Sequence, residues 1–369
     1  MSDMLRILHI VSSLGIGSGV MAVLMNYHRH IDRSKIQFDY LSFRETDRTF
    51  EQEIADLGGR VYHFHRPSFS RSFRQEALDF FVAHAVEYQV VHCHPIFTSA
   101  LFGPYMKKAG VSHIIQHSHT TRLSSNPLSA ARNFVLLIGC RRYATDFAAC
   151  SSAAKHIFFW LPQEKVHLIY NAISAEEFRF SDSARTSIRS SLAIPDEAMV
   201  LGHIGRFSPE KNHAFLIDVF EQIKAFRPET QLLLVGDGPG MDSVRALSEA
   251  KGLEKSIIFA GRQLKVADYL SAMDYFILPS TFEGFGNVLL EAQVSGLHCL
   301  ASTCVPQEVA CSEQASFLPL NDGSSRWAER ILQDMPSGLD KRDPVELPGK
   351  FDIRIAAGEL FEYYNSLLK

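Results

Sequence analysis

A chain of 369 residues is longer than one hydrophobic core usually supports, so we expect two domains. Apolar residues make up 46% and charged residues 21%, which is typical of a soluble globular protein, and no window of 18 or more apolar residues occurs that could span a membrane. The formal net charge is -4, but Lys and Arg outnumber Asp and Glu before about residue 168. This asymmetry suggests an anionic partner for the first half of the chain, with chance as an equal alternative; we expect no nucleic-acid partner.

The first twelve residues and the cysteines bear on the compartment. Met1 to Ser12 lacks a basic region followed by a long apolar stretch, so we expect no signal peptide. None of the six cysteines forms a Cys-x-x-Cys pair or a zinc-binding spacing. A reducing, cytoplasmic location is therefore predicted.

In the first half of the chain, short apolar runs alternate with amphipathic stretches. The runs predict strands over Leu5–Ser12, Phe38–Phe43, Arg60–Phe64, Val90–His94, His113–Ser118 and Asp146–Ser151. Helical patterns lie between them, over Val20–His30, Glu51–Leu57 and Ser72–Glu87. This alternation predicts a doubly wound α/β domain, with a parallel sheet covered by helices on both faces.

The same alternation starts again after a polar, charged segment at 171–196, which we interpret as a linker. The second set of predicted strands comprises Val200–Phe207, Leu232–Gly236, Ile257–Gly261, Tyr275–Pro279, Cys299–Ser302 and Ser316–Leu320. Residues 335–350 resemble a second linker, and 351–369 have helical periodicity. We therefore predict Rossmann-like domains at 1–172 and 173–350, facing a central cleft, with a C-terminal helix at 351–369 that crosses back onto the first domain.

A glycine-rich turn, Gly15 to Val20, follows the first predicted strand and precedes a helix. Such a turn brings the backbone close to a phosphate or sugar at a helix N-terminus. It lacks the third glycine of a dinucleotide fingerprint, so a structural turn remains an equal alternative.

Two His-x-His pairs, His92/His94 and His117/His119, end strands that we expect to be neighbours. Four imidazoles could bind zinc, but no carboxylate accompanies them in the sequence. A single histidine that donates a hydrogen bond to a diphosphate or a sugar hydroxyl is the favoured interpretation.

Two further motifs follow predicted strands of the second domain. In GRFSPEKN, Gly205 to Asn212, two cations at a strand end suit a diphosphate: Arg206 offers a planar fork and Lys211 a mobile charge. In FEGFGNVLLEAQVSG, Glu283 precedes a Gly-x-Gly turn, and a helix begins near Asn287, where exposed amides form an anion site. Glu291 lies one turn along that helix, so one carboxylate precedes the phosphate site and one lies beside it, which suits the hydroxyls of a sugar and of a ribose.

With these residues, the chain resembles the family 4 retaining glycosyltransferases of the GT-B fold, and most of all the branch that builds bacterial capsule, exopolysaccharide or O-antigen. The resemblance covers essentially the whole chain. It rests on the Glu-x7-Glu pair, on FDYLSF, VVHCH and IIQHSHT in the first half, and on HIGRFSPEKNH, LLLVGDGP and AMDYFILPSTFEGFGNVLLEA in the second.

The resemblance implies a hexosyltransferase that uses a nucleotide-diphosphate sugar, with uridine as the expected base, and a glycan or polyprenyl-linked acceptor. It implies that Arg206 and Lys211 neutralise the leaving group, that Glu283 orients the donor sugar, and that Glu291 holds the ribose. His117 matches the catalytic cleft histidine. The remaining implied donor contacts are Ser18, Gly19, Gly205, Gly261, Arg262, Phe285, Gly286, Asn287 and Val288, and the implied acceptor side is His94, His119 and Arg122.

The first loop departs from the family pattern. Family members often carry Gly-Gly-x-Glu, whereas this chain has Ser18, Gly19, Val20 and Met21. The missing acid puts acceptor contacts from the first domain in doubt.

No Asp-x-Asp occurs, so the carboxylate pair that often holds a divalent ion is absent from the sequence, and we predict transfer without a metal or other cofactor. Three alternatives stay open: a sugar-nucleotide epimerase, a zinc hydrolase built on the His-x-His pairs, and a catalytically inactive sugar-nucleotide-binding subunit. The helix predicted at Asn126–Tyr143 carries an apolar run flanked by arginines, which suits either burial or peripheral contact with the inner face of the plasma membrane.

Overall fold

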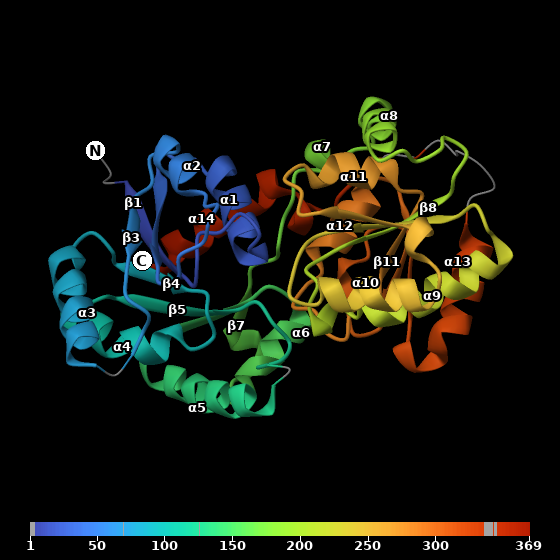
Figure 1. Ribbon diagram of the computed structural model, residues 1–369. Coiled ribbons are helices and arrows are strands. Elements are labelled where there is room, and N and C mark those ends of the chain that lie inside the picture. The colour runs from blue at the N-terminus through green and yellow to red at the C-terminus, as the bar shows by residue number, and fades with distance from the viewer. Residues whose placement is uncertain (1–3, 69, 125, 336–341, 343–344) are drawn as a thin grey trace. The chain divides into compact units, whose positions relative to one another are not determined.

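The computed structural model describes residues 4–68, 70–124, 126–335, 342 and 345–369. The chain divides into two compact units, Met1–Ile173 with Gly349–Lys369, and Ser174–Pro348. Each unit is built around one parallel sheet with helices on both faces (Figure 1). The cleft expected between the two domains stays a prediction.

The sheet of the first unit has seven strands in the order β3-β2-β1-β4-β5-β6-β7, and all neighbouring pairs are parallel. Their bounds are β1 Leu5–Val11, β2 Ile36–Ser42, β3 Val61–His63, β4 Val90–Cys93, β5 His113–Ser118, β6 Asp146–Ala149 and β7 Val166–Leu168. The order of the strands reverses between β1 and β4, and such a switch point is where doubly wound sheets bind ligands at the carboxyl ends of their strands. The sequence missed only the short strand β7.

Separate hydrophobic clusters cover the two faces of this sheet. On one face, α1 (Gly19–His30) and α14 (Ile353–Leu367) pack together against β1, β2 and β4. On the other face, α3 (Arg71–His84) and α4 (Thr98–Ala109) bury Phe81 and Phe102 against the sheet. The remaining helices are α2 (Glu51–Asp56), α5 (Pro127–Tyr143) and α6 (Ser152–Lys155).

The C-terminal helix α14 belongs to the first unit, as predicted. In Figure 1 this last, red helix lies among the blue N-terminal elements. Its side chains Ala356, Leu360 and Tyr364 are almost completely buried in the cluster that includes Ile7 and Phe38. A strong apolar stripe at helical spacing therefore predicted both the helix and the need for a docking surface.

The second unit has six parallel strands in the order β10-β9-β8-β11-β12-β13. The strands are β8 Val200–Ile204, β9 Gln231–Val235, β10 Ile257–Gly261, β11 Tyr275–Leu278, β12 His298–Ser302 and β13 Ala315–Leu318. The main helices are α9 His213–Phe226, α10 Met241–Ala250, α11 Val266–Ala272, α12 Asn287–Val294 and α13 Gly323–Asp334. The order reverses between β8 and β11, so the loops that follow these two strands meet at the switch point.

The prediction of an irregular linker at 171–196 was wrong. This segment contains α7 (Ala175–Phe178) and α8 (Asp182–Ser191), which belong to the second unit. Two of the charges that suggested a linker are buried and paired, because Arg185 and Arg189 both contact Asp274, at 2.7 and 2.6 Å. Half of the second expected linker, 335–350, lies outside the described residues.

In the part of the chain that the structure describes, no helix combines the length and the apolar character needed to cross a membrane.

Candidate functional site

Glycines bring the ends of β8 and β9 together in the second unit. A Cβ on Gly236 would lie 2.0 Å from the carbonyl oxygen of Gly205, and the φ of Gly236 is +144°. Only glycine fits this contact and this backbone conformation. The turns therefore hold the backbone after β8, where GRFSPEKN begins, directly against the backbone that follows β9.

Lys211 and Glu283 form the central contact of the second unit's switch point. Lys211 Nζ lies 2.5 Å from Glu283 Oε1, and both side chains are less than one-fifth exposed. Ser280 donates a second hydrogen bond to the same carboxylate oxygen at 2.7 Å. The backbones of the two loops are also joined, because the amide of Thr281 donates to the carbonyl of Glu210 at 2.8 Å.

The N-terminus of α12 follows Glu283 after three residues. Its N-cap is Gly286, with φ +98°, a residue that has no side chain of its own to cap the helix. The first amides of a helix carry partial positive charge. A helix that starts with glycine lets an anionic group approach these amides closely.

Glu291 lies one helical turn beyond Asn287. The pKa of Glu291 is raised to about 7, mainly by burial and also by the carboxylate of Glu177, while Lys211 acts in the opposite direction. Glu291 is thus within electrostatic reach of the Lys211–Glu283 pair. A carboxyl group with a raised pKa is typical of a functional site.

The other expected donor contacts in this unit differ in what they offer. Arg206 and Arg262 are exposed, and Gly205, Gly261, Asn287 and Val288 are partly buried. Phe285 is only 2% exposed, so its ring belongs to the core. Ser280 was not predicted as a site residue, and the one indication of its role in the sequence is its position three residues before Glu283.

In the first unit, Ser18 and Gly19 begin α1. The Ser18 hydroxyl caps this helix by accepting from the amide of Met21, so part of its hydrogen-bonding capacity is used locally. Met21, at the position where an acid was expected, is completely buried in the core. The carboxylate of the family pattern is therefore replaced here by a packing residue.

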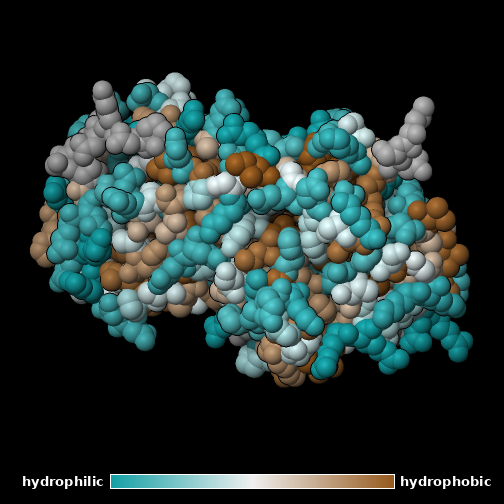
Figure 2. Space-filling model, turned by 180° about the vertical axis from the view of Figure 1, so that it is seen from behind, coloured by the Kyte–Doolittle hydropathy of each residue, from teal (hydrophilic) through white to brown (hydrophobic). Residues whose placement is uncertain are grey.

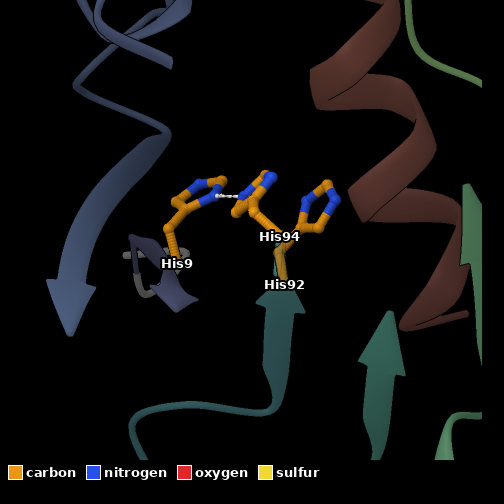
Figure 3. A group of neighbouring side chains, drawn as sticks. All are labelled: His9, His92 and His94. Carbon is orange, nitrogen blue, oxygen red and sulfur yellow. Dashed lines mark hydrogen bonds between the residues drawn. The ribbon is translucent and has the colours of Figure 1, made fainter. Parts of the chain in front are cut away.

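The two His-x-His pairs meet, as expected, because β4 and β5 are parallel neighbours. His92 Nε2 lies 3.0 Å from His117 Nδ1, and His94 Nδ1 lies 2.8 Å from His119 Nε2. A fifth histidine, His9 of β1, joins them with its Nδ1 2.9 Å from His94 Nε2 (Figure 3). In the sequence, the indication that His9 belongs to this group is its position in the first predicted strand, near the carboxyl ends of the strands that carry the two His-x-His pairs.

Burial lowers the pKa of all five imidazoles, to about 4 for His119 and well below the ordinary value for His9, His92, His94 and His117. They are therefore neutral at pH 7. Two groups have ligand atoms within 4.8 Å of one another and could hold a metal ion: His9, His92 and His94, and His94, His117 and His119. The same atoms already bond to one another, so an ion would have to replace these hydrogen bonds. Arg122, the last expected acceptor contact, is exposed in the loop after β5.

Comparison with known proteins agrees with this architecture. Residues 17–177 match the family described as Glycosyltransferase Family 4, and residues 198–335 match Glycosyl transferases group 1. The putative glycosyltransferase EpsF of Bacillus subtilis is 30% identical over 99% of this chain and 97% of its own length. The capsular polysaccharide biosynthesis glycosyltransferase CapH of Staphylococcus aureus is 26% identical over 98% and 99% of the two chains.

Solved structures confirm the GT-B fold. HepE of Anabaena, crystallised with UDP and glucose, has a TM-score of 0.81 at 21% identity, over 98% of this chain and all of that one. Sucrose-phosphate synthase of Thermosynechococcus elongatus has a TM-score of 0.77 at 19% identity, over 99% of both chains. Full-length similarity to EpsF, with family matches in each half, leads to one conclusion: this chain belongs to the family 4 glycosyltransferases.

Proposed function

We propose that the protein transfers a sugar from a nucleotide-diphosphate sugar, with uridine as the base, to a glycan or polyprenyl-linked acceptor in bacterial surface polysaccharide synthesis. The observation that carries the donor site is the Lys211–Glu283 pair at the switch point of the second unit, with Glu291 within its electrostatic reach. Relatives with capsular names and a fold neighbour crystallised with UDP support the choice of substrate. Family membership disfavours an epimerase and a zinc hydrolase.

In this proposal the diphosphate occupies the N-terminus of α12 and competes with Glu283 for Lys211. The ammonium group then stabilises the negative charge that develops as the bond from C1 of the sugar to the diphosphate breaks, with help from Arg206. Glu283, released from Lys211, accepts hydrogen bonds from the sugar hydroxyls. Glu291 accepts hydrogen bonds from the ribose.

We further propose that transfer retains the anomeric configuration and needs no metal ion. Lys211, Arg206 and the amides of α12 would supply the charge stabilisation that a divalent ion gives to other sugar nucleotides.

The donor class is tested by thermal stabilisation in EDTA against UDP, GDP, ADP, their common sugar conjugates, and NAD. A ligand at 100 times its dissociation constant adds about 2.7 kcal/mol of stability, which gives a clear shift of the melting temperature. We expect a shift with UDP and a UDP-sugar. No shift with any of them, or a shift with NAD alone, contradicts the donor site. Product formation in EDTA, with the anomeric configuration read by NMR, tests the metal-free retaining reaction.

The surface of α5 supports a peripheral contact with the membrane from the cytoplasmic side. Leu128 and Val135 are 83% and 69% exposed, and Ile138 lies on the same exposed side. Figure 2 shows hydrophobic atoms at the lower edge of this face, where α5 lies. Arg132, Arg141 and Arg142 are exposed beside this stripe. Apolar side chains framed by arginines suit an anionic bilayer surface.

We expect the protein to float with vesicles that contain phosphatidylglycerol and not with neutral phosphatidylcholine vesicles. Val135→Asp should weaken this binding about tenfold, since it places a charge in the apolar stripe and repels anionic lipid. The matched control is Phe226→Asp, which changes an equally exposed apolar residue on α9 of the second unit. Equal loss in both variants, or no flotation of the wild type, would contradict a role for α5.

A further inference from the structure

The hydroxyl of Tyr364 contacts a histidine that the proposed mechanism does not use. Tyr364 Oη lies 2.6 Å from Nδ1 of His92, and both side chains are at most 1% exposed. Tyr364 comes from the C-terminal helix α14, whereas His92 lies in β4, 272 residues earlier. In Figure 3 the His92 ring points away from β4 towards this helix.

The direction of this hydrogen bond follows from the inventory of donors and acceptors. A tyrosine hydroxyl has one hydrogen to donate, and a buried donor without a partner costs about 1–3 kcal/mol. Among the described residues, the acceptor within reach of this hydroxyl is His92 Nδ1. The hydroxyl therefore donates, and His92 Nδ1 carries no hydrogen.

The position of the hydrogen on His92 then determines that on His117. Burial lowers the pKa of both imidazoles well below the ordinary value, so each carries one hydrogen at pH 7. Because Nδ1 of His92 accepts, its hydrogen is on Nε2, which lies 3.0 Å from His117 Nδ1 and donates to it. His117 must therefore carry its own hydrogen on Nε2.

His117 Nε2 has no hydrogen-bond partner in the described residues, although this atom is buried and the whole residue is only 3% exposed. A buried N–H without a partner is costly and is ready to donate to a ligand oxygen.

We propose that Tyr364 and His92 are positioning residues that fix His117 as a hydrogen-bond donor through Nε2 to an oxygen of a bound sugar substrate. The identity of that oxygen rests on the proposed function; the tautomer of His117 does not. A neutral imidazole that donates in this way stabilises negative charge or orients a hydroxyl. It is not a general base, because the nitrogen that faces the ligand holds the hydrogen.

The second chain of imidazoles does not define a direction in this way. It runs from His119 through His94 to His9 and, in the described part of the chain, ends at the unpartnered Nε2 of His9 rather than at a hydroxyl. The inference is therefore confined to the chain that starts at Tyr364.

Nitrogen-15 NMR of protein with labelled histidine tests the tautomer without any ligand. A ring nitrogen that carries hydrogen has a different chemical shift from one that does not, so the spectrum shows which nitrogen is protonated. We expect His117, assigned by the loss of its signals in His117→Gln, to carry hydrogen on Nε2. In Tyr364→Phe, His92 loses the donor that selects its tautomer, so His117 should become a mixture of the two forms. The Michaelis constant for the sugar substrate that His117 contacts should then rise about tenfold in this variant.

The matched control is Tyr27→Phe. Tyr27 is also buried in the core cluster that contains α14, and its hydroxyl also makes a 2.6 Å hydrogen bond, but to the carbonyl of Tyr170. Both variants should lose similar stability, whereas only Tyr364→Phe should change the tautomer of His117. Hydrogen on Nδ1 of His117 in the wild type overturns the proposal even if Tyr364→Phe fails to fold. An unchanged tautomer in a folded Tyr364→Phe overturns it too, whereas a failure of sugar transfer by the wild type contradicts the proposed function alone.

Discussion

Lys211→Ala is expected to lower kcat by about 100- to 1,000-fold, which corresponds to about 3–4 kcal/mol of transition-state stabilisation. The reason is that negative charge on the diphosphate increases as the bond to C1 breaks, so an ammonium group beside it matters more in the transition state than in the bound donor. Binding of the donor should weaken much less, by about tenfold. Steady-state kinetics and a separate measurement of UDP affinity distinguish the two effects.

The structure adds a complication to this substitution. Removing Lys211 leaves Glu283 with Ser280 but without its ion pair, so some loss of stability is expected as well. The matched control is Lys251→Ala, since Lys251 is a similarly covered lysine of the same unit that pairs with Glu221 at 2.5 Å and Asp218 at 3.1 Å. If both variants lose similar stability but Lys251→Ala keeps full activity, the lower kcat of Lys211→Ala is due to its place in the site and not to lost stability. Equal reductions of kcat and of donor affinity in Lys211→Ala would contradict a transition-state role.

The sequence predicted the architecture well because both signals it relies on are local. Short β-branched runs such as Val90–Cys93 and apolar stripes such as that of α14 depend on neighbours along the chain. The segment 171–196 was misjudged because two of its arginines, Arg185 and Arg189, pair with Asp274, about 90 residues away, and no local pattern reveals such a partner.

The sequence predicted which residues belong to the candidate site but not which of them contact one another. Lys211 and Glu283 were assigned to different parts of the donor, whereas the structure joins them directly. Likewise, the four histidines were seen as pairs along the chain, but their connection to Tyr364 depends on how the last helix folds back onto the first sheet. Side-chain hydrogen bonds across such sequence separations require the tertiary structure.

Glu291→Gln is expected to make the ligand-free protein more stable above pH 7. Burial raises the pKa of Glu291 from 4.5 to about 7, so between these values the folded protein keeps a proton that the unfolded chain releases. The free energy of unfolding of the wild type therefore falls as the pH rises from 4.5 to 7, and the full cost is present above pH 7. At 1.36 kcal/mol per pKa unit the cost is at most about 3 kcal/mol, and partial exposure of the side chain reduces it to about 1–2 kcal/mol.

The same substitution should weaken UDP binding about tenfold or more at pH 8, because an amide replaces a carboxylate that accepts hydrogen bonds from the ribose hydroxyls. Ligand binding requires the ionised form of Glu291, so the ratio of wild-type to variant affinity should rise from pH 6 to pH 8. The ratio is the quantity to compare, because the terminal phosphate of UDP also titrates in this range and affects both proteins alike. Thermal melts and UDP titrations at pH 5, 6, 7 and 8 measure both effects, with Glu249→Gln on the exposed side of α10 as the control. If Glu291 binds nucleotide at the expense of stability, Glu291→Gln should be more stable than the wild type and should bind UDP more weakly. A variant that is less stable at pH 8 and binds UDP as well as the wild type would show that Glu291 is a structural carboxylate and that the ribose lies elsewhere.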